Sequence, residues 1–140
     1  MLTGTPHQQN AALNQYRNTA VQTAAPEKLL LMLYDGAIRF LQQAIKAIES
    51  KKPNEAHQNI VKAQNIIVEL TVTLNMDYPI SHNLKSLYDF FFQHLVQANI
   101  KKDAKMIEDI VELLSDLRKT WEEAARIAKS QSHSGGAAGV

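Results

Sequence analysis

The sequence predicts an all-α fold, an antiparallel up-down-up-down four-helix bundle with an N-terminal arm packed across it. Two observations favour this fold. Apolar residues recur at every third or fourth position through four long segments, which is the period of amphipathic helices. Proline and glycine are scarce, with 4 and 5 among 140 residues, and all but Gly36 lie near the ends of these segments or in the tails. No segment has the alternating pattern of a strand.

The first helix is predicted from Pro26 to about Ser50, because proline is favoured in the first helical turn. Gly36 interrupts it at a cost of about 1 kcal/mol relative to alanine. Either a neighbouring helix packs closely there, or the glycine marks a shallow place in a docking groove. The residues expected to face the core are Leu30, Leu33 or Tyr34, Ala37, Leu41, Ala44 or Ile45, and Ile48.

The second helix begins at Pro53 after a very short connection, and Asp77-Tyr78-Pro79 interrupts its pattern. Its apolar residues alternate regularly between steps of four and three. They are Ala56, Ile60, Ala63, Ile67, Leu70 and Leu74. Helices of matched length joined by short connections fold back antiparallel, which gives the bundle its topology.

The third helix is predicted to start near Ser81 and to end at Lys101-Lys102, and Asp103 is expected to cap the fourth. On the third helix the core positions are Leu84, Leu87 or Tyr88, Phe91, Leu95 and Ala98. On the fourth they are Ile107, Ile110 or Val111, Leu114, Leu117 or Arg118, Trp121, Ala125 and Ala128.

The chain is expected to form one domain, residues 13–129, between disordered tails at 1–12 and 130–140. The C-terminal tail is rich in serine and glycine and has no apolar period. The polar N-terminus is unlike a signal peptide, and no apolar stretch approaches the roughly 20 residues that span a bilayer. These features fit a cytoplasmic protein without membrane insertion.

Composition and motifs argue against most kinds of chemistry. A formal net charge of +1 offers little attraction to nucleic-acid phosphates, and the absence of cysteine excludes disulfides. The five histidines do not follow the Glu-x-x-His pattern of di-metal bundles, and no glycine-rich phosphate loop is present. The sequence therefore predicts no enzyme activity, no metal, no cofactor and no nucleic-acid binding.

Surplus apolar residues are the feature that points to a function. Residues 29–33 are five large apolar side chains in succession, and residues 90–92 are three phenylalanines. One core-facing stripe uses only every third or fourth of them, so the remainder favour a groove that takes a partner helix. The candidate partner-binding residues are Leu13, Tyr16, Val21, Leu29, Met32, Leu33, Phe40, Val68, Phe90 and Phe92.

The first three of these candidates belong to the N-terminal arm. Leu13, Tyr16 and Val21 are set among polar residues, which is too little apolar material to fold alone. The arm is enough to lie across a groove, with Tyr16 as its anchor. It is either a removable cover that yields to a partner or a permanently packed strap.

Several motifs resemble the flagellar secretion chaperone family, FliS. They are Tyr16, the block VQTAAPEKLLLMLYDGA at residues 21–37, Asn83-Leu84, Leu87-Tyr88-Asp89, Leu95, Ala98-Asn99, and Leu117-Arg118 with Trp121. The resemblance covers about residues 13–125. Two positions depart from the family pattern: Ala25 replaces a frequent serine, and Tyr78-Pro79-Ile80 replaces a glycine-rich turn.

The resemblance implies a cytoplasmic export chaperone. Such a protein binds the C-terminal region of flagellin, prevents its premature polymerisation and assists its delivery to the flagellar export apparatus. Two alternatives stay open from the residues alone. One is a structural bundle whose surplus apolar surface forms a homodimer, and the other is a ligand- or metal-binding bundle. The chaperone itself is also expected to be able to form a homodimer when its partner is absent.

Overall fold

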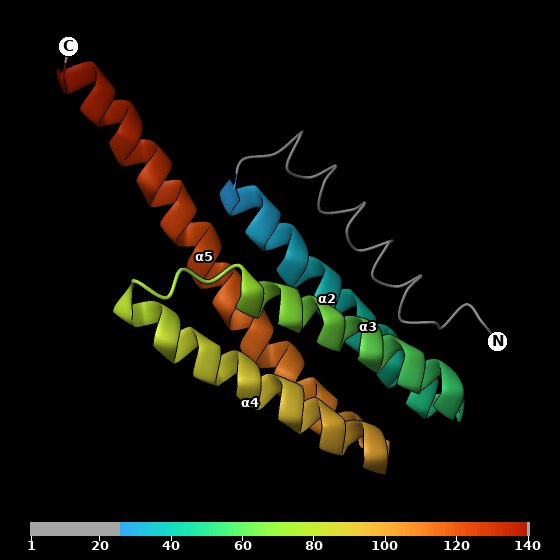
Figure 1. Cartoon of the computed structure of the whole chain (residues 1–140). Coiled ribbons are helices and arrows are strands. Elements are labelled where there is room, and N and C mark those ends of the chain that lie inside the picture. Colours follow the sequence, from blue (N-terminus) through green and yellow to red (C-terminus); the bar gives the residue numbers. More distant parts are fainter. Residues whose placement is uncertain (1–25, 140) are drawn as a thin grey trace.

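The computed structural model describes residues 26–139, and side chains from 27 to 131. It contains four helices: α2 (Pro26–Glu49), α3 (Pro53–Val72), α4 (Pro79–Lys101) and α5 (Ala104–Gly139) (Figure 1). Helices α2 and α4 each pack against both α3 and α5, and successive helices run in opposite directions. This arrangement confirms the predicted up-down-up-down bundle. The N-terminal arm, with Leu13, Tyr16 and Val21, lies outside the described residues.

Prolines start three of the helices, as the first-turn preference of proline requires. Pro26 and Pro53 stand where the sequence predicts, and α4 begins at Pro79, two residues earlier than expected. The predicted cap of α5 is also confirmed. The Asp103 carboxylate accepts hydrogen bonds from the backbone N–H groups of Lys105 and Met106, at 3.0 and 3.2 Å.

The core follows the predicted stripes closely. Its buried members are Leu33, Tyr34, Ala37, Leu41 and Ala44 of α2, Ile60, Ala63, Ile66, Ile67 and Leu70 of α3, Leu84, Tyr88, Phe91, Leu95 and Ala98 of α4, and Ile107, Ile110 and Leu114 of α5. Leu30, Ile48 and Leu74 were also expected there, but they lie at its edge and are only partly buried. A Cβ on Gly36 would stand 3.1 Å from Cδ1 of Ile66, so close helix packing accounts for this glycine.

Helix α5 extends beyond the other three helices (Figure 1). Its buried residues end at Leu114, and Leu117 and Trp121 are partly buried against the core. Ala128, which was expected in the core, is exposed because α5 has left the bundle at that point. The sequence predicts a disordered tail from residue 130, whereas the helix continues to Gly139. Alanine, lysine and arginine at 124–129 are strong helix formers, which accounts for the part of α5 that follows Trp121.

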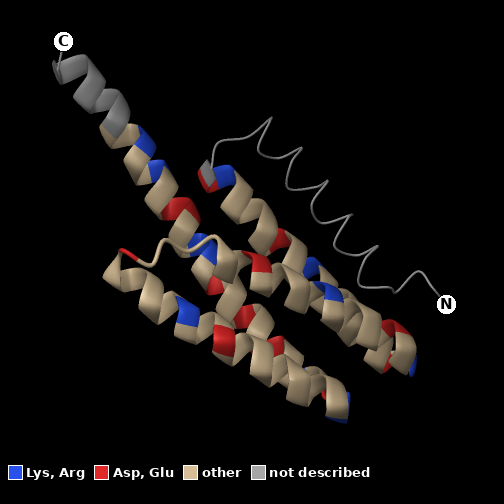
Figure 2. Ribbon diagram, viewed as in Figure 1, with Lys and Arg blue, Asp and Glu red and all other residues tan. Residues whose placement is uncertain are grey.

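Charged residues of both signs are interspersed along α2 and α5 (Figure 2). Within the described part of the chain, no helix is both long enough and apolar enough to cross a bilayer.

Candidate partner-binding surface

An apolar groove of about 250 Å³ lies between α3 and α4. Its lining consists of Ile67, Val68, Thr71 and Val72 from α3 and Tyr88, Asp89 and Phe92 from α4. Val68 and Val72 form its outer rim, because they are 47% and 70% exposed. An apolar trough with an exposed rim between two helices suits the apolar face of a third helix.

The spacing of residues on the two helices explains why the groove is open. Val68 and Val72 are four residues apart, so they share one face of α3. Both are short and β-branched, so they fill less of the space between α3 and α4 than longer side chains would. One helical turn before Val68, the Gln64 side-chain amide donates a hydrogen bond to the backbone carbonyl of Phe92 at 3.3 Å. This contact joins the two helices beside the groove.

Two of the sequence candidates, Val68 and Phe92, come together in this groove. Phe90 does not join them, because two residues on a helix turn the side chain by about 200°. It lies on the flank of α4 away from the groove and is 49% exposed. Its ring packs near those of Phe91 and His94, with centroids 6.1 and 5.3 Å away.

The α2 candidates form a separate set. Leu29 and Phe40 are partly buried against the core, and Met32 is also partly buried. The Phe40 ring has the Arg39 guanidinium 5.6 Å and the Lys62 ammonium 5.5 Å from its centroid, which is favourable cation–π geometry.

Not all of the surplus apolar residues are hidden by the bundle. Leu33 is 1% exposed and belongs to the core, so its side chain is not on this surface. In each of the two apolar runs, residues 29–33 and 90–92, only one member is fully buried: Leu33 in the first and Phe91 in the second.

Sequence reasoning missed several groove residues. Val72 was not a candidate, although its position four residues after Val68 was the signal that could have found it. Ile67 and Tyr88 were assigned to the core, and they are indeed buried while forming part of the groove lining. Nothing in the sequence distinguishes these two roles, because one side chain serves both.

A chain of hydrogen-bonded aromatic side chains crosses the core beside the groove. The hydroxyls of Tyr34 and Tyr88 are 2.5 Å apart, and the indole N–H of Trp121 donates to the Tyr34 oxygen at 3.0 Å. Burial raises the pKa of both tyrosines, and for Tyr88 the hydrogen bond with Tyr34 adds to the rise. Both hydroxyls therefore stay neutral in the physiological range.

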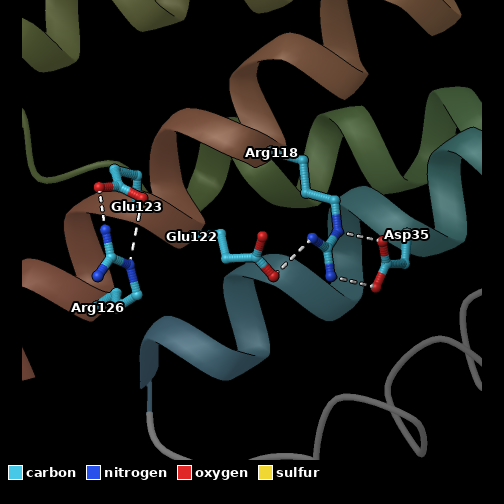
Figure 3. A network of polar contacts seen from close by, with 5 residues as sticks. All are labelled: Asp35, Arg118, Glu122, Glu123 and Arg126. Carbon is cyan, nitrogen blue, oxygen red and sulfur yellow. Dashed lines mark hydrogen bonds and ion pairs between the residues drawn. The ribbon is translucent and has the colours of Figure 1, made fainter.

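A surface ion pair joins α2 to α5 (Figure 3). The Arg118 guanidinium donates to both carboxylate oxygens of Asp35, at 2.5 and 3.2 Å, and to Glu122 at 3.1 Å. The hydrogen bond to Asp35 is the main cause that raises the pKa of Arg118. Arg126 and Glu123 form a further ion pair within α5. Forked arginine–carboxylate pairs fix geometry as well as charge.

Among the described residues, no group of three or more histidine, aspartate or glutamate side chains is arranged to hold a metal ion.

The sequence model of the family described as "Flagellar protein FliS" matches residues 8–128. The chain belongs to the FliS family. A Bacillus subtilis relative, named flagellar secretion chaperone FliS, is 40% identical over 121 residues, which cover 86% of this chain and 91% of the relative. A Salmonella typhimurium protein of the same name is 34% identical over 116 residues, covering 81% and 86%.

A solved structure described as "Crystal structure of flagellar chaperone from bacteria" has the same fold. Its TM-score is 0.69 at 23% identity, and the match covers 83% of this chain and 96% of that one. These findings confirm the family resemblance drawn from the sequence. The FliS chain described here is a flagellar secretion chaperone, a class that is not an enzyme class.

Proposed function

We propose that this chaperone binds the C-terminal segment of flagellin in the cytoplasm, keeps it from polymerising early and assists its delivery to the flagellar export apparatus. The observation that carries the proposal is the open apolar groove between α3 and α4, rimmed by Val68 and Val72. Family membership supports it, because FliS proteins are named for flagellar secretion.

The physical argument concerns the cost of ordering a partner. A segment that becomes helical on binding loses about 1 to 2 kcal/mol of backbone entropy per residue. It needs a long apolar contact to compensate, and one groove of about 250 Å³ is short for that purpose. We therefore include apolar residues outside the groove, Phe90, Leu29, Met32 and Phe40, in the proposed contact surface and leave out the buried Leu33.

The N-terminal arm completes the proposed surface. Leu13, Tyr16 and Val21 are proposed to cover part of the apolar surface and to yield it when flagellin arrives. Chaperoning of this kind uses the binding free energy of the partner alone and involves no cofactor.

The test compares two substitutions of equal exposure. Val72 and Ile100 are 70% and 71% exposed, but only Val72 lines the groove. A charge buried beneath an apolar partner is costly, so Val72→Asp should weaken binding of a flagellin C-terminal peptide by about tenfold or more, measured by calorimetry. Ile100→Asp is the matched control and should bind as the unsubstituted chain does.

Light scattering distinguishes the alternative of a homodimer. A one-to-one complex that forms with the peptide supports the chaperone, whereas a tight dimer that ignores the peptide contradicts it.

A further inference from the structure

The aromatic hydrogen bonds link three helices to the wall of the groove. Trp121 lies on α5, Tyr34 on α2 and Tyr88 on α4. The first bond joins the Trp121 indole N–H to the Tyr34 oxygen, and the second joins the two tyrosine hydroxyls. Tyr88 is at the same time part of the lining of the α3–α4 groove.

The Tyr34 oxygen takes part in both bonds. Among the described residues, neither tyrosine hydroxyl has another hydrogen-bond partner, and both side chains are at most 1% exposed. Removing the Tyr34 hydroxyl therefore takes away the hydrogen-bond partner of two groups, the partly buried indole N–H of Trp121 and the buried hydroxyl of Tyr88. A buried donor without a partner loses its hydration and gains nothing in return.

The Tyr88 hydroxyl would then favour any position in which it regains a polar partner. The groove offers one, because it opens to solvent past the exposed Val68 and Val72, with Thr71 and Asp89 also among its lining residues. A ring that turned toward them would occupy the volume that a partner helix needs.

We propose that Tyr34 is a positioning residue for the α3–α4 groove: its hydroxyl holds the Tyr88 ring out of the groove and couples the groove to Trp121. The proposal rests on the proposed function only in taking a flagellin peptide as the occupant. Because Trp121 is the single tryptophan of the chain, its fluorescence reports on the α5 end of this coupling.

The experiment uses three variants and a flagellin C-terminal peptide that lacks tryptophan. Tyr34→Phe should weaken the binding of the peptide by about tenfold, which corresponds to the cost of one buried polar group without a hydrogen-bond partner. Adding Tyr88→Phe to Tyr34→Phe removes the hydroxyl that was left without a partner and should restore the affinity. Tyr78→Phe is the matched control, because Tyr78 is exposed and outside the groove, and it should leave the affinity unchanged.

The rescue separates positioning from a general structural role. If Tyr34 only stabilises the fold, Tyr34→Phe will lower the unfolding midpoint without changing the dissociation constant of the peptide. The double variant will then bind the peptide with the same affinity as Tyr34→Phe. Peptide binding should also shift the Trp121 emission of the unsubstituted chain. An unshifted spectrum together with unchanged affinity in Tyr34→Phe overturns the coupling.

A crystal structure of Tyr34→Phe gives a readout that needs no peptide. The Tyr88 ring should lie turned into the groove, and a ring in its original place overturns the proposal. Failure of the unsubstituted chain to bind the peptide would instead count against the proposed function, and the position of Tyr88 would still decide this inference.

Discussion

The α2–α5 and α3–α4 contacts of the bundle are closed in different ways. Between α2 and α5, the Arg118 guanidinium reaches Asp35 and the Trp121 indole reaches Tyr34. Between α3 and α4, the hydrogen bond of Gln64 joins the helices at one level, and a groove lies open beside it. Long side chains with terminal donors span the first contact, whereas short valines line the second. The bundle therefore closes the α2–α5 contact with long side chains and leaves apolar space between α3 and α4.

Truncation on the two sides should therefore have different costs, and Trp121→Ala should show the largest effect. Trp121 is partly buried against the core and donates to Tyr34, so its loss should cost about 2 to 3 kcal/mol of unfolding free energy. Val72→Ala, on the exposed rim of the groove, should cost less than about 0.5 kcal/mol. Chemical denaturation of both variants measures the difference. Equal losses would show that the two sides do not differ in this way.

The ion pair between α2 and α5 should contribute less than the indole. Asp35→Asn removes the charge that Arg118 binds, and the carboxylate is half exposed, so a loss of about 0.5 to 1 kcal/mol is expected. The difference from the unsubstituted chain should shrink in high salt, because exposed charges are screened. Denaturation at two salt concentrations measures it. A loss that does not change with salt would mean that packing, and not charge, is responsible.

Alkaline pH should destabilise the chain through the two buried tyrosines, with no such effect below the ordinary tyrosine pKa of 10.0. The pKa values of Tyr34 and Tyr88 are raised in the folded state, so above that pH the unfolded chain loses protons that the folded chain retains. The contribution of these two tyrosines to the free energy of unfolding should then be constant through neutral pH and fall as the pH rises past 10.0. The double variant with Tyr34→Phe and Tyr88→Phe should show a shallower fall. Chemical denaturation at a series of alkaline pH values measures this difference. Equal slopes for the unsubstituted chain and the double variant would contradict the prediction.

Local signals in the sequence were sufficient for the fold. Pro26 and Pro53 mark helix starts because proline fits a first turn wherever the helix packs, and Asp103 caps α5 through its own neighbours. The core stripes followed from the helical period, which places Ile60, Ala63 and Ile67 on one face. These features depend on residues within a few positions of one another.

The candidate site depends on which neighbouring helix packs against each side of a given helix. The helical period of the apolar residues does not determine that. Phe90 and Phe92 have the same chemistry, yet only Phe92 lines the groove because α3 packs on its side of α4. The pairing of Asp35 with Arg118 joins residues 83 positions apart, so no local pattern marks it. Leu33 was expected both on the core stripe and among the partner-binding candidates, and it is buried in the core.

The close contact at Gly36 offers a route to a more heat-resistant chaperone. Alanine at this position favours the helix by about 1 kcal/mol, but its methyl group would meet Cδ1 of Ile66 at 3.1 Å. Shortening that neighbour with Ile66→Val makes room, so the pair of substitutions together should raise the melting temperature more than Gly36→Ala alone. Neither Gly36 nor Ile66 lines the groove, so thermal stability and partner binding can be engineered separately.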